Sequence, residues 1–284
     1  MCRESGSILL YGKTGIGKTR FLWQLACGLA RGQETLGLKP IKPLRISLVE
    51  ADMFRTDFES LVKEYAAKGI VAPDSIYWFS RDDTTPYWIQ GQFGKALLAH
   101  NQAHDIDLTI YDAIPDIFLG DANDSATAMK TIRELHAAAN GRAYLGVLTQ
   151  RKGQPTARDT EGENVDEMLG SQAWARAAST VWQLTNVPSL VWVKHRLCQK
   201  PAPLPFSVAP NGVWALKGAG ALGLIQREAA RGFTSVRELV ARVQATSEYK
   251  SLDTPYKDRM LREFAADALA KGKIVMGQSP LEGL

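Results

Sequence analysis

The chain of 284 residues is 45% hydrophobic and 23% charged, and it carries a formal net charge of +4 at pH 7. This composition is typical of a globular protein, and the absence of a long apolar run excludes a membrane-spanning class, so we expect a cytoplasmic protein with no membrane partner. Three cysteines exclude a disulfide framework, and the mild positive charge permits nucleic-acid binding without requiring it.

A glycine-rich loop, residues 12–19, lies between a predicted strand at 7–11 and a predicted helix at 21–30. The loop matches the pattern G-x-x-x-x-G-K-[ST] at every fixed position, which predicts a phosphate-binding site. Its backbone N–H groups and the positive end of the helix dipole create an anion site. Lys18 is placed to reach the β- and γ-phosphates, and the Thr19 hydroxyl to ligate Mg²⁺. The predicted nucleotide-binding residues here are Gly12, Thr14, Gly15, Ile16, Gly17, Lys18, Thr19 and Arg20.

Strand and helix patterns then alternate. The predicted elements are strands at 44–49, 76–79 and 108–112, and helices at 57–68 and 88–104. The strand at 108–112 ends in Asp112, and we expect it to lie next to the first strand, where the carboxylate would hold Mg²⁺ through water. An acid at a strand end is also common without any function, so the prediction depends on its pairing with the phosphate loop.

The rest of the first domain is predicted to contain further strands and helices around one long polar loop at 153–169, and long loops of this kind are usually functional. The predicted elements are helices at 126–140 and 170–178, and strands at 143–149, 180–184, 190–193, 206–208 and 213–216. Gln150 follows one strand, and Lys194 and Arg196 follow another.

The last part of the chain has a different pattern from the alternating strands and helices before it. Three glycines between residues 218 and 223 mark a flexible junction, and two amphipathic helices are predicted at 236–245 and 257–271. A short strand at 272–275 would complete a small winged-helix or helix-turn-helix fold, which serves either nucleic-acid binding or protein contacts. We therefore predict a large α/β core at 1–217 that contains the phosphate loop, a linker at 218–233, and a small helical or winged-helix-like domain at 234–284.

Residues 7–216 resemble the RecA-like P-loop ATPases and, among them, the hexameric replicative helicases of the plasmid RepA and DnaB type. The resemblance implies an α/β core with a twisted, mostly parallel sheet. In this family a glutamate after the second strand activates the attacking water, and Glu50 matches that place. Gln150 matches a residue that senses the γ-phosphate. Lys194 and Arg196 resemble the basic pair that one subunit presents to the nucleotide site of its neighbour.

The resemblance thus implies a Mg²⁺-dependent ATPase that forms a homo-oligomer, expected to be a hexameric ring, and acts on single-stranded DNA as a helicase, with ATP and Mg²⁺ as its cofactors. Two alternatives stay open. One is a non-unwinding ATPase with the same core, such as a recombination mediator or a helicase loader. The other is a regulatory module that binds ATP as a switch and hydrolyses it slowly.

Overall fold

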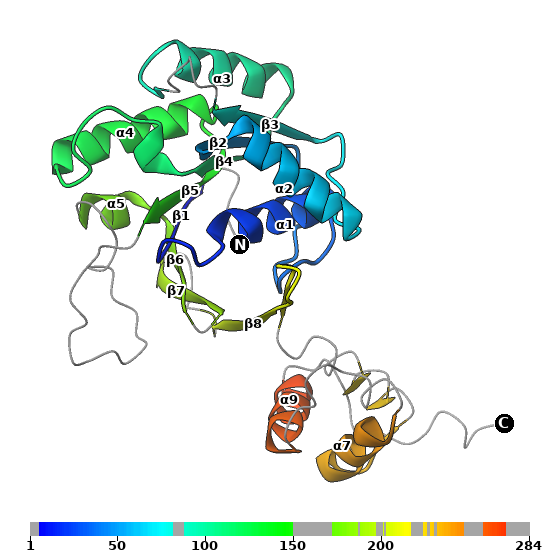
Figure 1. The fold of residues 1–284 in the computed structure, drawn as a ribbon. Helices are drawn as coiled ribbons and strands as arrows, with labels where there is room; N and C mark the ends of the chain where they lie inside the picture. Colours follow the sequence, from blue (N-terminus) through cyan, green and yellow to red (C-terminus); the bar gives the residue numbers. More distant parts are fainter. Residues whose placement is uncertain are drawn as a thin grey trace. The chain divides into compact units, whose positions relative to one another are not determined.

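The computed structural model describes residues 6–81, 88–149, 172–186, 188–196, 201, 203–216, 224–225, 228–229, 232–246 and 258–270. The chain divides into two compact units, Met1–Trp214 and Ala215–Leu284. The first contains a large sheet and the second contains a pair of packed helices (Figure 1). In the described part of both units, no helix is long and apolar enough to cross a membrane.

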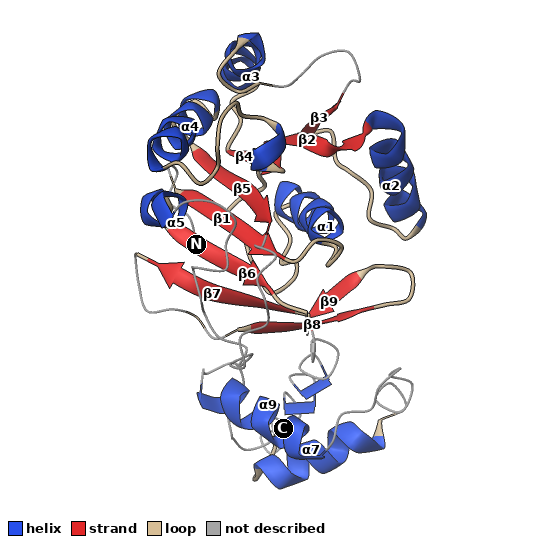
Figure 2. Ribbon diagram, turned by 60° about the vertical axis from the view of Figure 1, so that its left-hand side comes forward, coloured by secondary structure: helices blue, strands red, loops and turns tan. Residues whose placement is uncertain are grey.

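The described strands form one nine-stranded sheet in the order β3-β2-β4-β5-β1-β6-β7-β8-β9 (Figure 2). From β3 across to β6 the neighbouring strands are parallel, whereas β7 is antiparallel to both β6 and β8. The strands are β1 Ser7–Gly12, β2 Ile46–Phe54, β3 Ile76–Arg81, β4 Leu108–Asp112, β5 Ala143–Thr149, β6 Thr180–Leu184, β7 Ser189–His195, β8 Leu204–Val208 and β9 Trp214–Leu216.

Parallel strands require crossover connections, and helices supply them on both faces of the sheet. Helices α1 and α2 cover one face, and α3, α4 and α5 cover the other (Figure 2). Their bounds are α1 Lys18–Ala30, α2 Arg55–Ala67, α3 Gln92–Ala103, α4 Ser125–Ala138 and α5 Gln172–Ala177, with a 3₁₀ turn at Ile114–Asp116. This layered sheet confirms the predicted α/β core.

Three local predictions are wrong. The strand of Asp112 does not lie next to the first strand, because β5 pairs with both β1 and β4 and separates them. Strand β2 continues to Phe54 instead of ending at residue 49, so Glu50 lies inside it. Helix α3 begins at Gln92 instead of residue 88, because the chain turns before it and the Gly91 N–H bonds the Trp88 carbonyl at 3.0 Å.

The parallel strands of the core end at one edge of the sheet, which positions the site. Gly12 of β1 is the register partner of Thr149 of β5, and Glu50 of β2 is the partner of Asp112 of β4. The carboxyl ends of these four strands therefore meet along one line, where ligands bind in open α/β sheets.

The second unit contains α7, Val236–Ala245, and α9, Asp258–Ala270. Leu239 and Val243 of α7 are completely buried, as are Leu261 and Ala265 of α9, and these side chains belong to one cluster. Ser235 caps α7 by accepting a hydrogen bond from the Glu238 N–H at 3.2 Å. The strand predicted at 272–275 lies outside the described residues, so the winged-helix fold stays a prediction.

Candidate functional site

The phosphate loop connects β1 to α1 in a conformation that its glycines make possible. Gly15 and Gly17 have φ of 81° and 93°, in the left-handed region that other residues rarely adopt. Gly17 is the N-cap of α1, and no side chain caps this helix end. The first N–H groups of α1 are therefore available to an anion, as the sequence pattern predicts.

Lys18 supplies a positive charge to this loop. Its Nζ donates hydrogen bonds to the carbonyls of Gly12 and Lys13, each at 3.1 Å. Burial lowers the pKa of Lys18, and the carboxylates of Asp112 and Asp52 partly oppose this shift. The ammonium group thus lies between the loop carbonyls and nearby acids, where a phosphate could bind it directly.

Asp112 lies at the end of β4, only 4% exposed, with the Thr19 hydroxyl beside its carboxylate. Burial raises the pKa of Asp112 to about 6, although Thr19 and the Lys18 ammonium oppose the rise. Within the described part of the chain, the Asp112 Oδ2 atom has no hydrogen-bond partner. A buried, unpartnered carboxylate oxygen next to a hydroxyl is a donor set that suits a hard cation, so Thr19 and Asp112 fit Mg²⁺.

A cavity of about 480 Å³ brings these groups together. Most of the predicted nucleotide-binding residues line it, and so do four polar or flexible side chains of β2 and α2 that the sequence did not single out. The predicted residues are Thr14, Gly15, Gly17, Lys18, Thr19, Arg20 and Asp112, and the additional ones are Asp52, Met53, Asp57 and Ser60. No described group of three or more His, Cys, Asp or Glu side chains forms a separate metal centre.

Glu50 lies behind this cavity and does not line it. Its side chain is completely buried, and its Oε1 atom accepts hydrogen bonds from the N–H groups of Asp52 at 3.0 Å and Met53 at 2.9 Å. Burial raises the pKa of Glu50 to about 9, and the neighbouring Asp112 carboxylate adds to the rise. In this structure Glu50 therefore favours its protonated form and shapes the end of β2, where Asp52 and Met53 meet the cavity.

Of the other predicted site residues, the structure describes Lys194 and Arg196, which do not line the cavity. Gln150 and the loop at 153–169 lie outside the described residues, although Thr149, which precedes Gln150, lines the cavity. Lys194 lies within β7, which runs to His195 instead of ending at residue 193, and Arg196 directly follows it. His195 pairs with Thr180 at the start of β6, so both basic residues lie at the opposite edge of the sheet. The structure therefore separates this basic pair from the phosphate loop of its own chain.

Lys194 and Arg196 instead bond the carboxyl end of α5. The Lys194 Nζ donates to the carbonyls of Arg176 at 3.1 Å and Ala178 at 2.9 Å, and also to that of Ala175. The Arg196 guanidinium donates to the Arg176 carbonyl. Burial, together with Arg196, lowers the pKa of Lys194 to about 8. Cations at a helix C-terminus stabilise its last carbonyls, so both side chains cap α5.

A family model described as AAA domain matches residues 1–149. The ATPase domain of G40P is similar in structure, with a TM-score of 0.56 and 11% identity, over 76% of this chain and 86% of that one. A KaiC-like protein from Pyrococcus horikoshii OT3 gives a TM-score of 0.47 and 16% identity, over 75% of this chain and 89% of that one. The curated proteins contain no match.

Proposed function

Because the AAA domain model matches just over half of its residues, the chain belongs to that family, and we propose that it is an oligomeric, Mg²⁺-dependent ATPase that acts on DNA. The core has the fold of the RecA-like P-loop ATPases, to which the likeness to the ATPase domain of G40P also points. Within this class of ATPases, we propose that the chain is a replicative-type helicase, as the resemblance to the RepA and DnaB branch implies.

One observation carries the proposal: a phosphate loop, a lysine, a hydroxyl and a buried carboxylate converge on one cavity at the carboxyl edge of the sheet. Lys18 would bind the β- and γ-phosphates, and the α1 N–H groups would bind phosphate oxygens. Thr19 and Asp112 would hold Mg²⁺, which neutralises charge on the phosphates when bound. Each of these groups is already at the cavity, so binding requires only local rearrangement of Lys18.

Glu50 is our candidate for the group that accepts a proton from the attacking water. Its carboxyl faces Asp112 in the strand register, and its raised pKa favours the protonated form. A proton acceptor must first be ionised, which requires additional positive charge near Asp112. We propose that the occupied site supplies this charge, so that Glu50 becomes a base only with nucleotide and cation in place.

The positions of Lys194 and Arg196 support an oligomer. Both lie toward the edge of the sheet opposite the phosphate loop, so they cannot reach the phosphates of their own chain. An arginine can stabilise the charge that develops on a transferred phosphoryl group, and a second subunit can provide it. We propose that this pair acts on a neighbour's nucleotide, with Gln150 as the γ-phosphate sensor, in a hexameric ring around single-stranded DNA.

A second candidate is an ATP-dependent switch with very slow turnover. Two observations favour it: Glu50 does not line the cavity, and Lys194 and Arg196 are bonded to α5 of their own chain. A non-unwinding ATPase, such as a recombination mediator or a helicase loader, shares the core and differs only in strand separation.

The test is ATP turnover with Mg²⁺ for the wild-type chain, Lys18→Ala, Asp112→Asn and a surface control, Lys130→Ala. We expect Lys18→Ala to lose ATP binding, Asp112→Asn to lose the Mg²⁺ dependence and most of the turnover, and the control to match wild type. Wild-type binding without measurable turnover would favour the switch. Equal turnover in wild type and Lys18→Ala would contradict the proposed site.

A further inference from the structure

The cavity at the phosphate loop has to hold the attacking water, and Glu50 is not part of its wall. The Glu50 side chain is completely buried and does not line the cavity. A water molecule that attacks the γ-phosphate must lie inside the cavity with its oxygen directed at the phosphorus atom. A hydrogen-bond acceptor in the wall can fix that direction, so the wall itself is expected to provide one.

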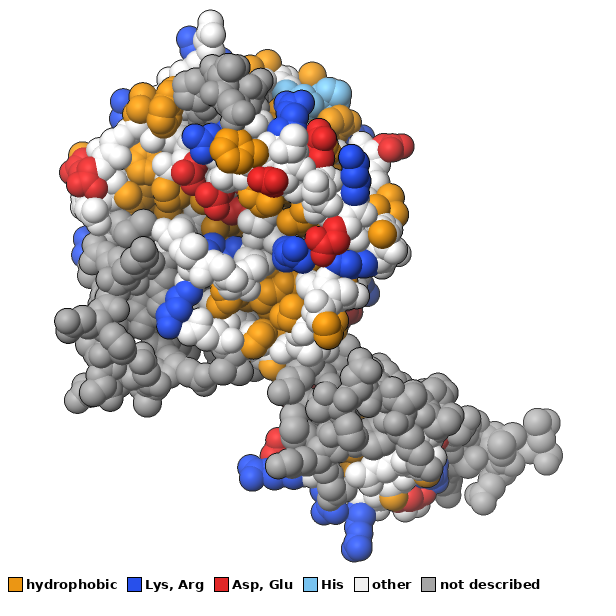
Figure 3. All heavy atoms as spheres, in the orientation of Figure 1, with side chains coloured by type: hydrophobic (Ala, Val, Ile, Leu, Met, Phe, Trp, Pro, Cys, Tyr) orange, Lys and Arg blue, Asp and Glu red, His pale blue; other side chains and the backbone are white. Residues whose placement is uncertain are grey.

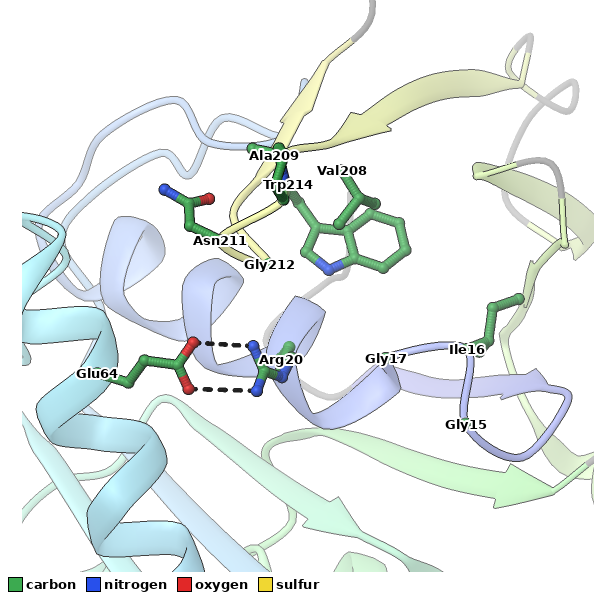
Figure 4. Close-up of a pocket in the computed structure, with 11 residues that line it drawn as sticks. Gly15, Ile16, Gly17, Arg20, Glu64, Val208, Ala209, Asn211, Gly212 and Trp214 are labelled. Carbon is green, nitrogen blue, oxygen red and sulfur yellow. Dashed lines mark hydrogen bonds and ion pairs between the residues drawn. The ribbon is translucent and has the colours of Figure 1, made fainter.

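Four carboxylates line the cavity among the residues that the structure describes. Asp112 is the proposed ligand of Mg²⁺. Glu64 is already bonded, because its carboxylate accepts two hydrogen bonds from the Arg20 guanidinium, at 3.0 and 3.2 Å, which are drawn in Figure 4. Asp52 and Asp57 are therefore the two carboxylates that remain for a water molecule.

Of these two, Asp52 lies near the residues proposed for the terminal phosphates and Mg²⁺. Its negative charge acts to raise the pKa of Lys18, against the effect of burial, and it adds to the raised pKa of Asp112. Charges act strongly only over short distances, so Asp52 lies close to both groups. Asp57, in the first turn of α2, is not among the charges that shift either pKa. Asp52 is thus the carboxylate at the γ-phosphate end of the cavity.

An irregularity in β2 directs Asp52 into the cavity. Strand β2 pairs with β3 in register as far as Glu50 and Ser80, and the pairing resumes only at Phe54 with Arg81. Residues 51–53 have no partner in β3 between these two points. A bulge of this kind changes the direction of side chains and is common next to active sites.

Glu50 fixes the backbone of this bulge. Its Oε1 atom accepts hydrogen bonds from the N–H groups of Asp52 at 3.0 Å and Met53 at 2.9 Å. The Asp52 side chain itself is exposed, so water in the cavity can reach it. An acceptor that is held in place before the reaction needs no reorganisation when the water attacks.

We propose that Asp52 orients the attacking water by accepting a hydrogen bond from it, while Glu50 takes the proton that is released. This inference rests on the proposed function. The water oxygen bonds the γ-phosphorus as the bond to the bridging oxygen breaks, and the proton passes to the Glu50 carboxylate. Asp52 therefore contributes to turnover and not to ATP binding.

The experiment compares wild type, Asp52→Ala, Asp52→Asn and a matched control, Asp57→Asn, on the full chain. It measures kcat at several Mg²⁺ concentrations, and the binding of a non-hydrolysable ATP analogue by calorimetry. Both Asp52 variants keep the backbone N–H that Glu50 accepts, so the end of β2 stays in place. The control removes a charge from an exposed residue that lines the same cavity.

We expect Asp52→Ala to lower kcat about 100-fold, because the water loses its orientation. Asp52→Asn should lower kcat about tenfold, since the amide oxygen still accepts one hydrogen bond but carries no charge. Analogue binding and the Mg²⁺ requirement should stay at wild-type values in both variants, and the control should match wild type throughout.

Wild-type kcat in both Asp52 variants would overturn the inference and leave the proposed function standing. A raised Mg²⁺ requirement would also overturn it, since Asp52 would then act through the cation. An equal loss of kcat in Asp57→Asn would do the same, because the effect would come from the charge of the cavity in general. If the wild-type chain bound the analogue but had no turnover at any protein concentration, the proposed function would fail, and the inference with it.

Discussion

Glu50 and Asp112 show how one side-chain pair serves both the structure and the site. The two residues face each other across β2 and β4, and burial raises the pKa of each. Glu50 also accepts two backbone hydrogen bonds that shape the end of β2. Its substitution can therefore disturb either the fold or the chemistry, and the choice of variant decides which effect is seen.

Glu50→Gln should keep the fold and lose turnover. The amide oxygen can still accept the N–H groups of Asp52 and Met53, whereas the amide cannot take a proton from water. We expect stability within about 1 kcal/mol of wild type and retained ATP binding. Glu50→Ala removes the acceptor and should cost about 3 kcal/mol in free energy of unfolding. Urea denaturation and steady-state turnover check both variants, and wild-type turnover in Glu50→Gln would remove Glu50 from the mechanism.

Gly15 and Gly17 offer a matched pair within the phosphate loop. Both have positive φ, so an alanine at either position is strained by about 1 kcal/mol. An alanine Cβ at Gly17 would also lie 3.3 Å from the Trp214 indole, whereas one at Gly15 would meet no described atom within 4 Å. Gly17→Ala should therefore lower the melting temperature more than Gly15→Ala does. Equal melting temperatures would show that the contact with Trp214 is unimportant.

At the scale of elements, the phosphate loop was predictable because its signal is local: glycines, a lysine and a threonine at fixed spacing between a strand and a helix. The strand order was not, because β5 inserts between β1 and β4 through pairing that no local pattern encodes. The continuation of β2 past residue 49 depends on the hydrogen bonds that the Glu50 side chain accepts from the N–H groups of Asp52 and Met53. The position of the turn between β8 and β9 depends on the hydrogen bonds between Gln24 and Trp214, which are 190 residues apart.

Helix α5 depends on the residue that caps it. Lys194 bonds three carbonyls at its carboxyl end, and Arg196 also bonds one of them, that of Arg176, so Lys194→Met should remove the lysine donor from the Ala175 and Ala178 carbonyls and cost about 1 kcal/mol. We expect faster hydrogen exchange in residues 173–178 and little change elsewhere. Lys130→Met is the control, since the Lys130 side chain is 73% exposed and lies 4.0 Å from Glu134. Unchanged exchange in α5 would contradict the capping role.

The loop before β2 is joined to the start of β5 by Asp107. Its carboxylate accepts hydrogen bonds from the Arg45 N–H at 3.0 Å and the Lys42 ammonium at 2.6 Å, and it pairs with Arg142 at 3.4 Å. Burial alone would raise the pKa of Asp107, but these donors outweigh it and hold the pKa below its ordinary value of 3.8.

A lowered pKa in the folded state means that the Asp107 carboxylate stabilises the fold above about pH 4, and that this contribution is lost as the pH falls further. Asp107→Asn should cost about 1.5 kcal/mol at pH 7 and much less at pH 3. Urea denaturation of both proteins at the two pH values measures the difference. If the difference in free energy of unfolding between wild type and Asp107→Asn were the same at pH 7 and pH 3, the stabilising role of the Asp107 carboxylate would be contradicted.

For the whole molecule, the central question is whether its sites are completed between subunits. The phosphate loop and the Lys194–Arg196 pair lie toward opposite edges of one sheet. This arrangement suits a ring in which each chain supplies the basic pair to the nucleotide site of its neighbour. The face of the first unit drawn in Figure 3 mixes acidic and basic side chains, so it does not present one large basic surface for DNA. DNA binding is thus expected to depend on assembly.

The most direct test is ATP hydrolysis at several protein concentrations, with and without single-stranded DNA, while the mass of the assembly is followed in parallel. We predict that turnover per chain rises as the oligomer forms, that single-stranded DNA raises it further, and that Arg196→Ala removes the rise without preventing ATP binding. Turnover per chain that is the same at every concentration, in monomer and oligomer alike and with or without DNA, would contradict the account.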